Sequence, residues 1–138
     1  MVACVWVYDG KGKILLTKRA PEKSAAGTWE NSGGAVRAGE DSRTAVAREL
    51  FEETGISAPK EDFELLDQCT DGKIHYDHYC LCWQIPLDKI VLQPGETVDV
   101  QWASFCQIHR LIDSKQMCHA IAKQFCKLEQ ALRSRQSA

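Results

Sequence analysis

The sequence predicts one domain of the α+β class over residues 1–138, and three observations lead to that class. Segments rich in β-branched and aromatic residues, bounded by turn-forming residues, predict strands. Other segments carry capping residues or apolar side chains at helical spacing, which predict helices. The chain has 138 residues without an internal repeat or a linker, which is the length of a single domain with one sizeable core.

A β-hairpin is predicted at the start of the chain. Residues 2–8 are β-branched and aromatic, and residues 13–18 form the returning strand. The turn between them is Asp9-Gly10-Lys11-Gly12, whose two glycines permit positive φ. Residues 19–28 are expected to form a polar loop, and residues 29–37 a loop followed by a short strand.

A helix is predicted over residues 41–54, because Asp41 or Ser42 can cap its N-terminus and Gly55 follows its C-terminus. Further strands, loops and two helical stretches are expected beyond it: strands 63–69 and 73–85 joined by a turn at 70–72, a loop at 86–95, a strand at 97–104 and a C-terminal helix over about 115–133. One apolar stripe at helical spacing indicates the last helix: Met117, Ile121, Phe125, Leu128 and Leu132.

Composition excludes several classes of protein. Seventeen basic and nineteen acidic residues give a net charge of −2, so no basic surplus points to a nucleic-acid partner. No apolar stretch is long enough for a membrane span, and the N-terminus lacks the pattern of a secretion signal. The seven cysteines are scattered, without a Cys-x-x-Cys pair, so we interpret them as reduced thiols. A cytoplasmic protein without a membrane partner is therefore expected.

The predicted helix at 41–54 carries an acidic cluster beside its apolar face. At about 100° per residue, the apolar side chains on the expected core side span an arc of about 140°: Val46, Leu50, Ala47 and Phe51. Three carboxylates share an arc of about 100° next to it: Glu52, Glu49 and Glu53. Mg²⁺ and Mn²⁺ prefer oxygen ligands, so this cluster suggests a metal site. A solvated acidic helix face is the alternative interpretation.

Two glycines precede this helix and extend the pattern. Gly33-Gly34 leaves a backbone that can approach a phosphate or offer a carbonyl to a metal. Gly34 is followed after five residues by Glu40 and after seven more by the segment Arg48-Glu49-Leu50-Phe51-Glu52-Glu53-Thr54-Gly55-Ile56. This order over residues 34–56 resembles the Nudix box, G-x5-E-x7-R-E-U-x-E-E-x-G-U with U apolar, of the Nudix (MutT-like) hydrolases. Every fixed position of that pattern is filled.

The resemblance implies a Nudix fold, in which a mixed β-sheet lies between helices, and a hydrolase that cleaves a nucleoside diphosphate linked to another group. By position it implies Glu49, Glu52 and Glu53 as metal ligands and catalytic residues, with a metal contact from the Gly33 carbonyl. It gives Arg48 a catalytic role in orienting Glu49. Two further positions of the box are implied to be structural: Glu40 and Gly55. The implied cofactor is Mg²⁺, for which Mn²⁺ can substitute.

Candidates outside the box are fewer. Lys18 and Arg19 end the second strand on the side of the glycine loop, and with Gly34 they are candidates for substrate binding. Glu96 precedes the last strand and is a candidate for a further metal ligand. The expected partner is a small nucleotide-type molecule rather than a nucleic acid, and a homodimer is a candidate state.

Three alternatives remain at this point. An isopentenyl-diphosphate isomerase would share the fold, but it needs a reactive cysteine and metal-binding histidines near the glycine loop, where this sequence has Trp29-Glu30-Asn31-Ser32-Gly33-Gly34-Ala35-Val36. A catalytically silent nucleotide-binding domain is disfavoured because Glu49, Glu52 and Glu53 are all present. A decapping-type enzyme is disfavoured because there is little basic surface for RNA.

Overall fold

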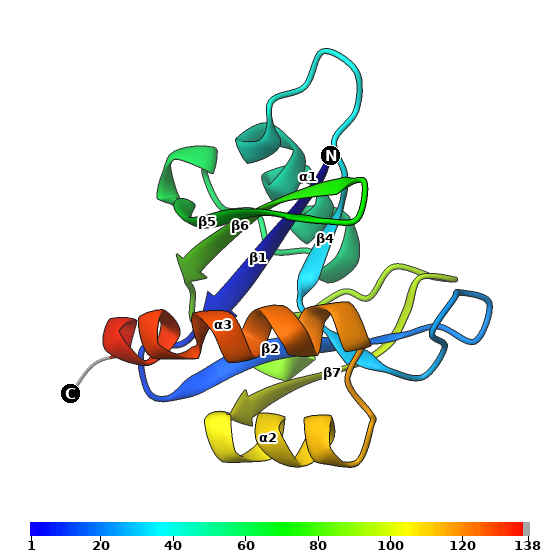
Figure 1. Cartoon of the computed structure of the whole chain (residues 1–138), viewed down its shortest axis with the longest axis vertical. Helices are drawn as coiled ribbons and strands as arrows, with labels where there is room; N and C mark the ends of the chain where they lie inside the picture. The colour runs from blue at the N-terminus through cyan, green and yellow to red at the C-terminus, as the bar shows by residue number, and fades with distance from the viewer. Residues whose placement is uncertain (137–138) are drawn as a thin grey trace.

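Strand β1 lies at the centre of a seven-stranded mixed sheet in the computed structural model, which describes residues 1–136 (Figure 1). The strands are β1 Val2–Tyr8, β2 Lys13–Arg19, β3 Trp29–Glu30, β4 Ser32–Ala35, β5 Glu64–Asp71, β6 Ile74–Cys82 and β7 Thr97–Ser104. The helices are α1 Ser42–Thr54, α2 Phe105–Asp113 and α3 His119–Arg135, with short 3₁₀ turns at Lys60–Asp62 and Leu87–Lys89. Residues 137–138 of the expected domain lie outside the described residues.

Strand β1 has one partner on one side and two partners on the other. On one side β1 pairs in parallel with β6 over its whole length, from Val2↔Tyr76 to Tyr8↔Cys82. On the other side it pairs with two strands in succession, with β4 from Val2 to Val5 and with β2 at Tyr8. Strands β4 and β2 therefore diverge from β1, and β2 continues the sheet to β3 and β7.

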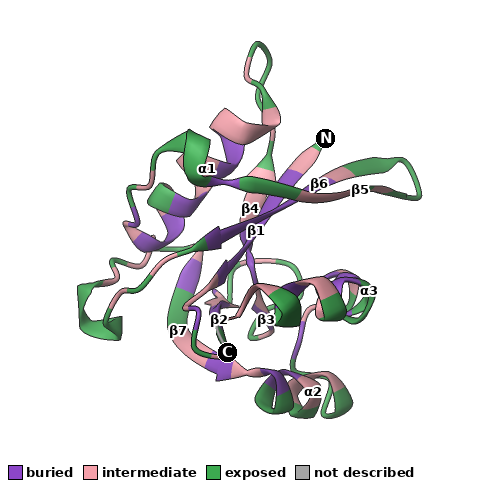
Figure 2. Ribbon diagram, turned by 90° about the vertical axis from the view of Figure 1, so that its left-hand side faces the viewer, coloured by how far each residue is buried: buried purple, intermediate pink, exposed green. Residues whose placement is uncertain are grey.

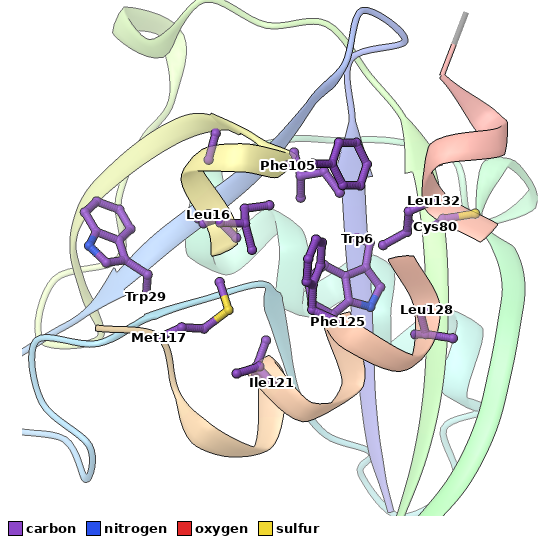
Figure 3. Packing of buried hydrophobic residues seen from close by; sticks show 14 residues of the cluster. Trp6, Leu16, Trp29, Cys80, Phe105, Met117, Ile121, Phe125, Leu128 and Leu132 are labelled. Carbon is purple, nitrogen blue, oxygen red and sulfur yellow. The ribbon is translucent and has the colours of Figure 1, made fainter. Parts of the chain in front are cut away.

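Helices cover both faces of the sheet, α1 on one face and α3 with α2 on the other (Figure 2). Side chains alternate along β1, so Val5 and Val7 face α1 whereas Trp6 faces α3. On the second face Trp6 packs against Phe125 of α3, with ring centroids 5.8 Å apart (Figure 3). This architecture confirms the expected α+β class and the mixed sheet between helices.

Helix α1 begins and ends where its capping residues predict. The Asp41 side chain accepts a hydrogen bond from the Thr44 backbone N–H at 2.7 Å. Gly55 adopts the left-handed conformation, with φ of 79°, and donates to the Phe51 carbonyl at 2.8 Å. Local hydrogen bonds thus define both ends of this helix.

One expectation about the face of α1 is wrong. Val46 and Leu50 are buried as predicted, but the Phe51 side chain is 56% exposed. The buried face is centred on Val46 and includes Glu53 and Thr54, because α1 packs against β4 and β1 through that side. Phe51 lies beyond the edge of this contact.

Element boundaries also differ from the sequence prediction in the second half of the chain. Strands β5 and β6 pair as far as Asp71↔Ile74, so the turn is at Gly72-Lys73 and not at residues 70–72. Helix α3 begins at His119 and not at residue 115, because the residues before it pair with Trp29 of β3. The Trp29 N–H donates to the Gln116 carbonyl, and the Cys118 N–H donates to the Trp29 carbonyl. No helix among the described residues combines the length and apolar character needed to cross a bilayer.

Candidate active site

Strand β4, helix α1 and two loops enclose a cavity of about 260 Å³ that is lined almost entirely by polar atoms. Its lining residues are Lys23, Gly33, Gly34, Ala35, Glu49, Glu52, Glu53, Gln93 and Glu96. The structure therefore brings together the three helix glutamates, both glycines and the distant loop residue Glu96. We call this space the carboxylate cavity.

The glycines of β4 are required by the close approach of neighbouring groups. A Cβ atom at Gly34 would lie 2.5 Å from the Cδ atom of Glu49, so any side chain there would displace the Glu49 carboxylate. A Cβ atom at Gly33 would lie 2.4 Å from the Ala3 carbonyl oxygen of β1. Gly34 thus admits the first glutamate of α1 to the cavity, and Gly33 allows β4 to pair with β1.

The backbone of Gly33 faces the carboxylate cavity. Its N–H donates a hydrogen bond to Glu53 Oε2 at 3.1 Å and not to β1. In an extended strand the N–H and C=O of one residue point to the same side, so the Gly33 carbonyl also faces away from β1. This orientation makes the carbonyl available to a cation in the cavity.

Glu53 is the most deeply buried of the helix glutamates, with 8% of its surface exposed. Burial raises its pKa to about 8, and the nearby carboxylates of Glu30 and Glu49 add to the increase, whereas the Gly33 hydrogen bond opposes it. Burial also raises the pKa of Glu49, against the opposing effect of Arg48. A cation in the cavity would stabilise both groups in the charged form.

Arg48 organises the outer side of the cluster. Its guanidinium binds both carboxylate oxygens of Glu40, at 2.8 and 3.0 Å, and Glu49 Oε1 at 3.0 Å. It also contacts Glu52 Oε1 at 3.3 Å and the Ala35 carbonyl at 3.2 Å. These bonds to Arg48 hold the pKa of Glu40 at about 2. Glu40 is therefore charged at neutral pH and anchors the arginine.

The oxygen atoms that line the carboxylate cavity are suitable ligands for a hard divalent cation. They are carboxylate and backbone oxygens, which are the ligands that Mg²⁺ and Mn²⁺ prefer. In the described part of the chain no three histidine, cysteine or acidic side chains converge into a ready-made metal cage. Arg48 engages Glu49 and Glu52, so a cation in the cavity would compete with the arginine for these carboxylates.

The two basic candidates from the end of β2 differ in position. Arg19 forms an ion pair with Glu30 at 2.8 Å and lines a second cavity of about 200 Å³ on the other side of Gly33 and Gly34. Lys18 lies over the Trp29 ring, with Nζ 5.9 Å from the ring centroid, and is not among the residues that line either cavity.

Sequence reasoning missed three residues of this region. Lys23 extends from the loop between β2 and β3 into the carboxylate cavity, where it pairs with Glu96. Glu30 and Asn31 line the second cavity, and the Asn31 amide is 2% exposed with no hydrogen-bond partner for Nδ2 among the described residues. The position of Glu30 and Asn31 directly before Gly33-Gly34 could have indicated them, whereas no local pattern marks Lys23.

Fold and site together define a hydrolase that acts on pyrophosphate bonds, in which a glutamate-bearing helix lies against a glycine strand. The family model described as "NUDIX domain" matches residues 1–125, and the chain belongs to that family.

Curated relatives and solved structures agree with this membership. CTP pyrophosphohydrolase from Escherichia coli (strain K12) is 35% identical over 99 residues, which are 71% of this chain and 71% of that protein. Isopentenyl-diphosphate Delta-isomerase 2 from Photorhabdus laumondii is 46% identical over 118 residues, 80% of this chain and 65% of that protein. A bifunctional NMN adenylyltransferase/ADP ribose pyrophosphatase from Francisella tularensis, complexed with AMP and Mn ion, superposes with a TM-score of 0.76 at 21% identity. That match covers 94% of this chain and 41% of the other, and because the identity is only 21% it supports the fold alone.

Proposed function

We propose that this chain is a Mg²⁺-dependent pyrophosphohydrolase that cleaves the diphosphate of a nucleotide or a small nucleotide derivative, with Mn²⁺ as a substitute. One observation carries the proposal: the Glu49 carboxylate occupies the space that a side chain at Gly34 would fill, beside Glu52 and Glu53. This packing directs carboxylates and backbone to one cavity, where a metal and the phosphates of a substrate can meet.

The proposed roles follow from the contacts of each residue. Glu49, Glu52, Glu53 and the Gly33 carbonyl would hold the metal, with Glu96 as a candidate for a further ligand. A bound metal would neutralise phosphate charge and lower the pKa of an attacking water. Arg48 is a positioning residue for Glu49 and Glu52, and Glu40 in turn fixes Arg48. Gly55 ends α1.

We propose the second cavity as the place for the nucleoside or other group attached to the phosphates. It adjoins the carboxylate cavity at Gly33 and Gly34, which line both. Arg19 and the unpartnered Asn31 amide supply hydrogen-bond donors there. The substrate is then a small molecule, in keeping with the absence of a basic surplus in the sequence.

Isomerase activity on a diphosphate is the second candidate, because the Photorhabdus relative carries that name. The residues near the site argue against it. Residues 29–36 contain neither cysteine nor histidine. Cys4, the thiol beside Gly33, is 4% exposed, and burial raises the pKa of that thiol, which suppresses the reactive thiolate.

Four further expectations accompany the proposal. The unit of function is the single domain of residues 1–138, it acts in the cytoplasm, and a homodimer is its candidate assembly. Neither a nucleic acid nor a membrane is expected as a partner.

A phosphate-release screen tests the function. The protein is incubated with a nucleotide library and Mg²⁺, with and without added inorganic pyrophosphatase, and isopentenyl diphosphate is included with detection of double-bond migration. We expect hydrolysis of at least one free nucleotide and its loss in excess chelator. Undiminished turnover in chelator would refute the metal dependence, and double-bond migration without hydrolysis would establish the isomerase instead.

A further inference from the structure

Lys23 is the one cationic side chain that lines the carboxylate cavity within residues 1–136. It faces four carboxylates there, those of Glu49, Glu52, Glu53 and Glu96. Its ammonium group forms an ion pair with Glu96, and about a third of the Lys23 side chain is exposed. The pair is therefore accessible from solvent and lies at the edge of the cavity.

The backbone places Lys23 at this edge by joining two loops. The Ala20 N–H donates to the Glu96 carbonyl at 3.0 Å, and the Lys23 N–H donates to the Ala20 carbonyl at 3.1 Å. The carbonyl of the next residue, Ser24, accepts a hydrogen bond from Arg19 Nε at 2.7 Å. The loop that carries Lys23 is thus held at both the end of β2 and the start of β7, with its side chain directed into the cavity.

Charge balance decides what this lysine can do. Without a metal, Lys23 compensates the negative charge of Glu96, while Arg48 pairs with Glu49 and Glu52. A divalent cation in the same cavity supplies two positive charges, which repel the ammonium group and compete with it for Glu96. A diphosphate brings several negative charges and acceptor oxygens, to which a lysine released from Glu96 can donate.

We propose that Lys23 is a phosphate-binding residue of this site, that it pairs with Glu96 in the metal-free protein, and that metal binding releases it to the substrate. The phosphate half of this inference rests on the proposed function, whereas the competition with metal does not. Lys23 opposes metal binding and favours phosphate binding, so its removal has opposite effects on the two ligands. A purely structural role in holding the loop would weaken both.

The test compares Lys23→Met, Lys23→Arg and the matched control Lys73→Met, an exposed lysine in the turn between β5 and β6. Mn²⁺ affinity is measured without substrate, by the loss of the free-ion paramagnetic resonance signal. We expect Lys23→Met to bind Mn²⁺ about three- to tenfold more tightly than wild type, because a competing cation is gone. Lys23→Arg and Lys73→Met are expected to remain near wild type.

The second measurement is calorimetric binding of methylenediphosphonate, a non-hydrolysable diphosphate, to the Mg²⁺-loaded protein. We expect Lys23→Met to bind it about tenfold or more weakly, since a charge-assisted hydrogen bond is lost, and Lys23→Arg to retain most of the affinity. Unchanged or weaker Mn²⁺ binding by a folded Lys23→Met would overturn the competition. Unchanged methylenediphosphonate binding would overturn the phosphate contact. A wild-type protein that hydrolyses no nucleotide while these shifts hold would instead refute the proposed function.

Discussion

Helices α1 and α3 cover opposite faces of the same sheet, and different interactions hold each of them. Helix α1 is capped by Asp41 at its N-terminus and by Gly55 at its C-terminus. Helix α3 has Cys118 at its N-cap position, where no side-chain hydrogen bond closes the helix. Its buried face instead carries large apolar side chains such as Phe125 and Leu132.

The composition of the two buried faces follows this difference. The face that α1 turns to the sheet includes the carboxylate of Glu53, which accepts a hydrogen bond from Gly33. A buried carboxylate opposes folding, and caps and apolar contacts elsewhere on α1 offset that cost. The helix with strong local signals thus carries the glutamates of the proposed active site, whereas the helix without them supplies apolar burial.

The largest expected effect is the loss of turnover on the α1 side. Glu52→Gln and Glu53→Gln each remove one charge from the carboxylate cavity while preserving side-chain size, and each is expected to lower kcat at least about a hundredfold. The metal-free thermal midpoint of neither variant is expected to fall. Glu61→Gln, at an exposed acid between α1 and β5, is the control in the same turnover and melting assays. Near wild-type turnover of both cavity variants would refute the assignment of the active site to α1.

On α3, removal of a buried side chain is expected to lower the stability of the fold. Phe125 packs against Trp6 and Phe105, with centroids 5.8 Å away in each case. Phe125→Ala is expected to lower the free energy of unfolding by about 3–5 kcal/mol, measured by urea denaturation. The neighbouring exposed residue provides the matched variant Cys126→Ala, for which a change within about 0.5 kcal/mol is expected. An equal effect of both would mean that α3 is not held by this packing.

The stability of the metal-free protein is expected to depend on pH in opposite ways on the two faces of the sheet, through Glu53 on the α1 face and His78 on the α3 face. The pKa of Glu53 is raised to about 8 in the folded protein, so between about pH 4.5 and 8 the native state retains a proton that the unfolded state has released. The contribution of Glu53 therefore makes the protein more stable as pH falls from about 8 towards 4.5. His78, buried beneath α3, acts in the opposite sense: burial lowers its pKa to about 4, so stability is lost as pH falls from about 6.5 to 4.

Denaturation in chelator at a series of pH values measures the contributions of both Glu53 and His78 to stability. Glu53→Gln is expected to remove the gain in stability between pH 8 and 6.5 and to make the loss below pH 6.5 steeper, because Glu53 no longer opposes the effect of His78. Added Mg²⁺ should reduce the pH dependence of wild-type stability that is due to Glu53, because a bound cation stabilises the ionised carboxylate. If stability still increases as pH falls below 8 in Glu53→Gln, this pH dependence belongs to another group.

The smallest expected effect concerns the two helix starts. Asp41→Ala removes the cap of α1 and is expected to lower the free energy of unfolding by about 1 kcal/mol. Cys118→Ala, at the same position of α3, removes no capping bond and should change it by less than about 0.5 kcal/mol. Chemical denaturation of the two variants side by side distinguishes them, and equal losses would contradict the difference in capping.

The sequence by itself determined the features that depend on near neighbours. The limits of α1 followed from Asp41 and Gly55, whose hydrogen bonds reach only three or four residues along the chain. The spacing of Gly34, Glu40, Arg48 and the helix glutamates matches the Nudix box, a pattern that is visible in the sequence without the fold. Helical periodicity placed the three glutamates of α1 on one side. The apolar stripe of α3 was predictable for the same reason.

Tertiary structure alone decided the features that join distant segments. The parallel pairing of Val2–Tyr8 with Tyr76–Cys82 brings together strands about 70 residues apart, and neither strand encodes its partner. The burial of Glu53 and the exposure of Phe51 followed from where β4 lies against α1, which the helical projection does not contain. Lys23 reached the carboxylate cavity because its loop is fixed to Glu96, 73 residues away. Local periodicity acts over one or two helical turns, whereas these placements depend on how the whole sheet packs.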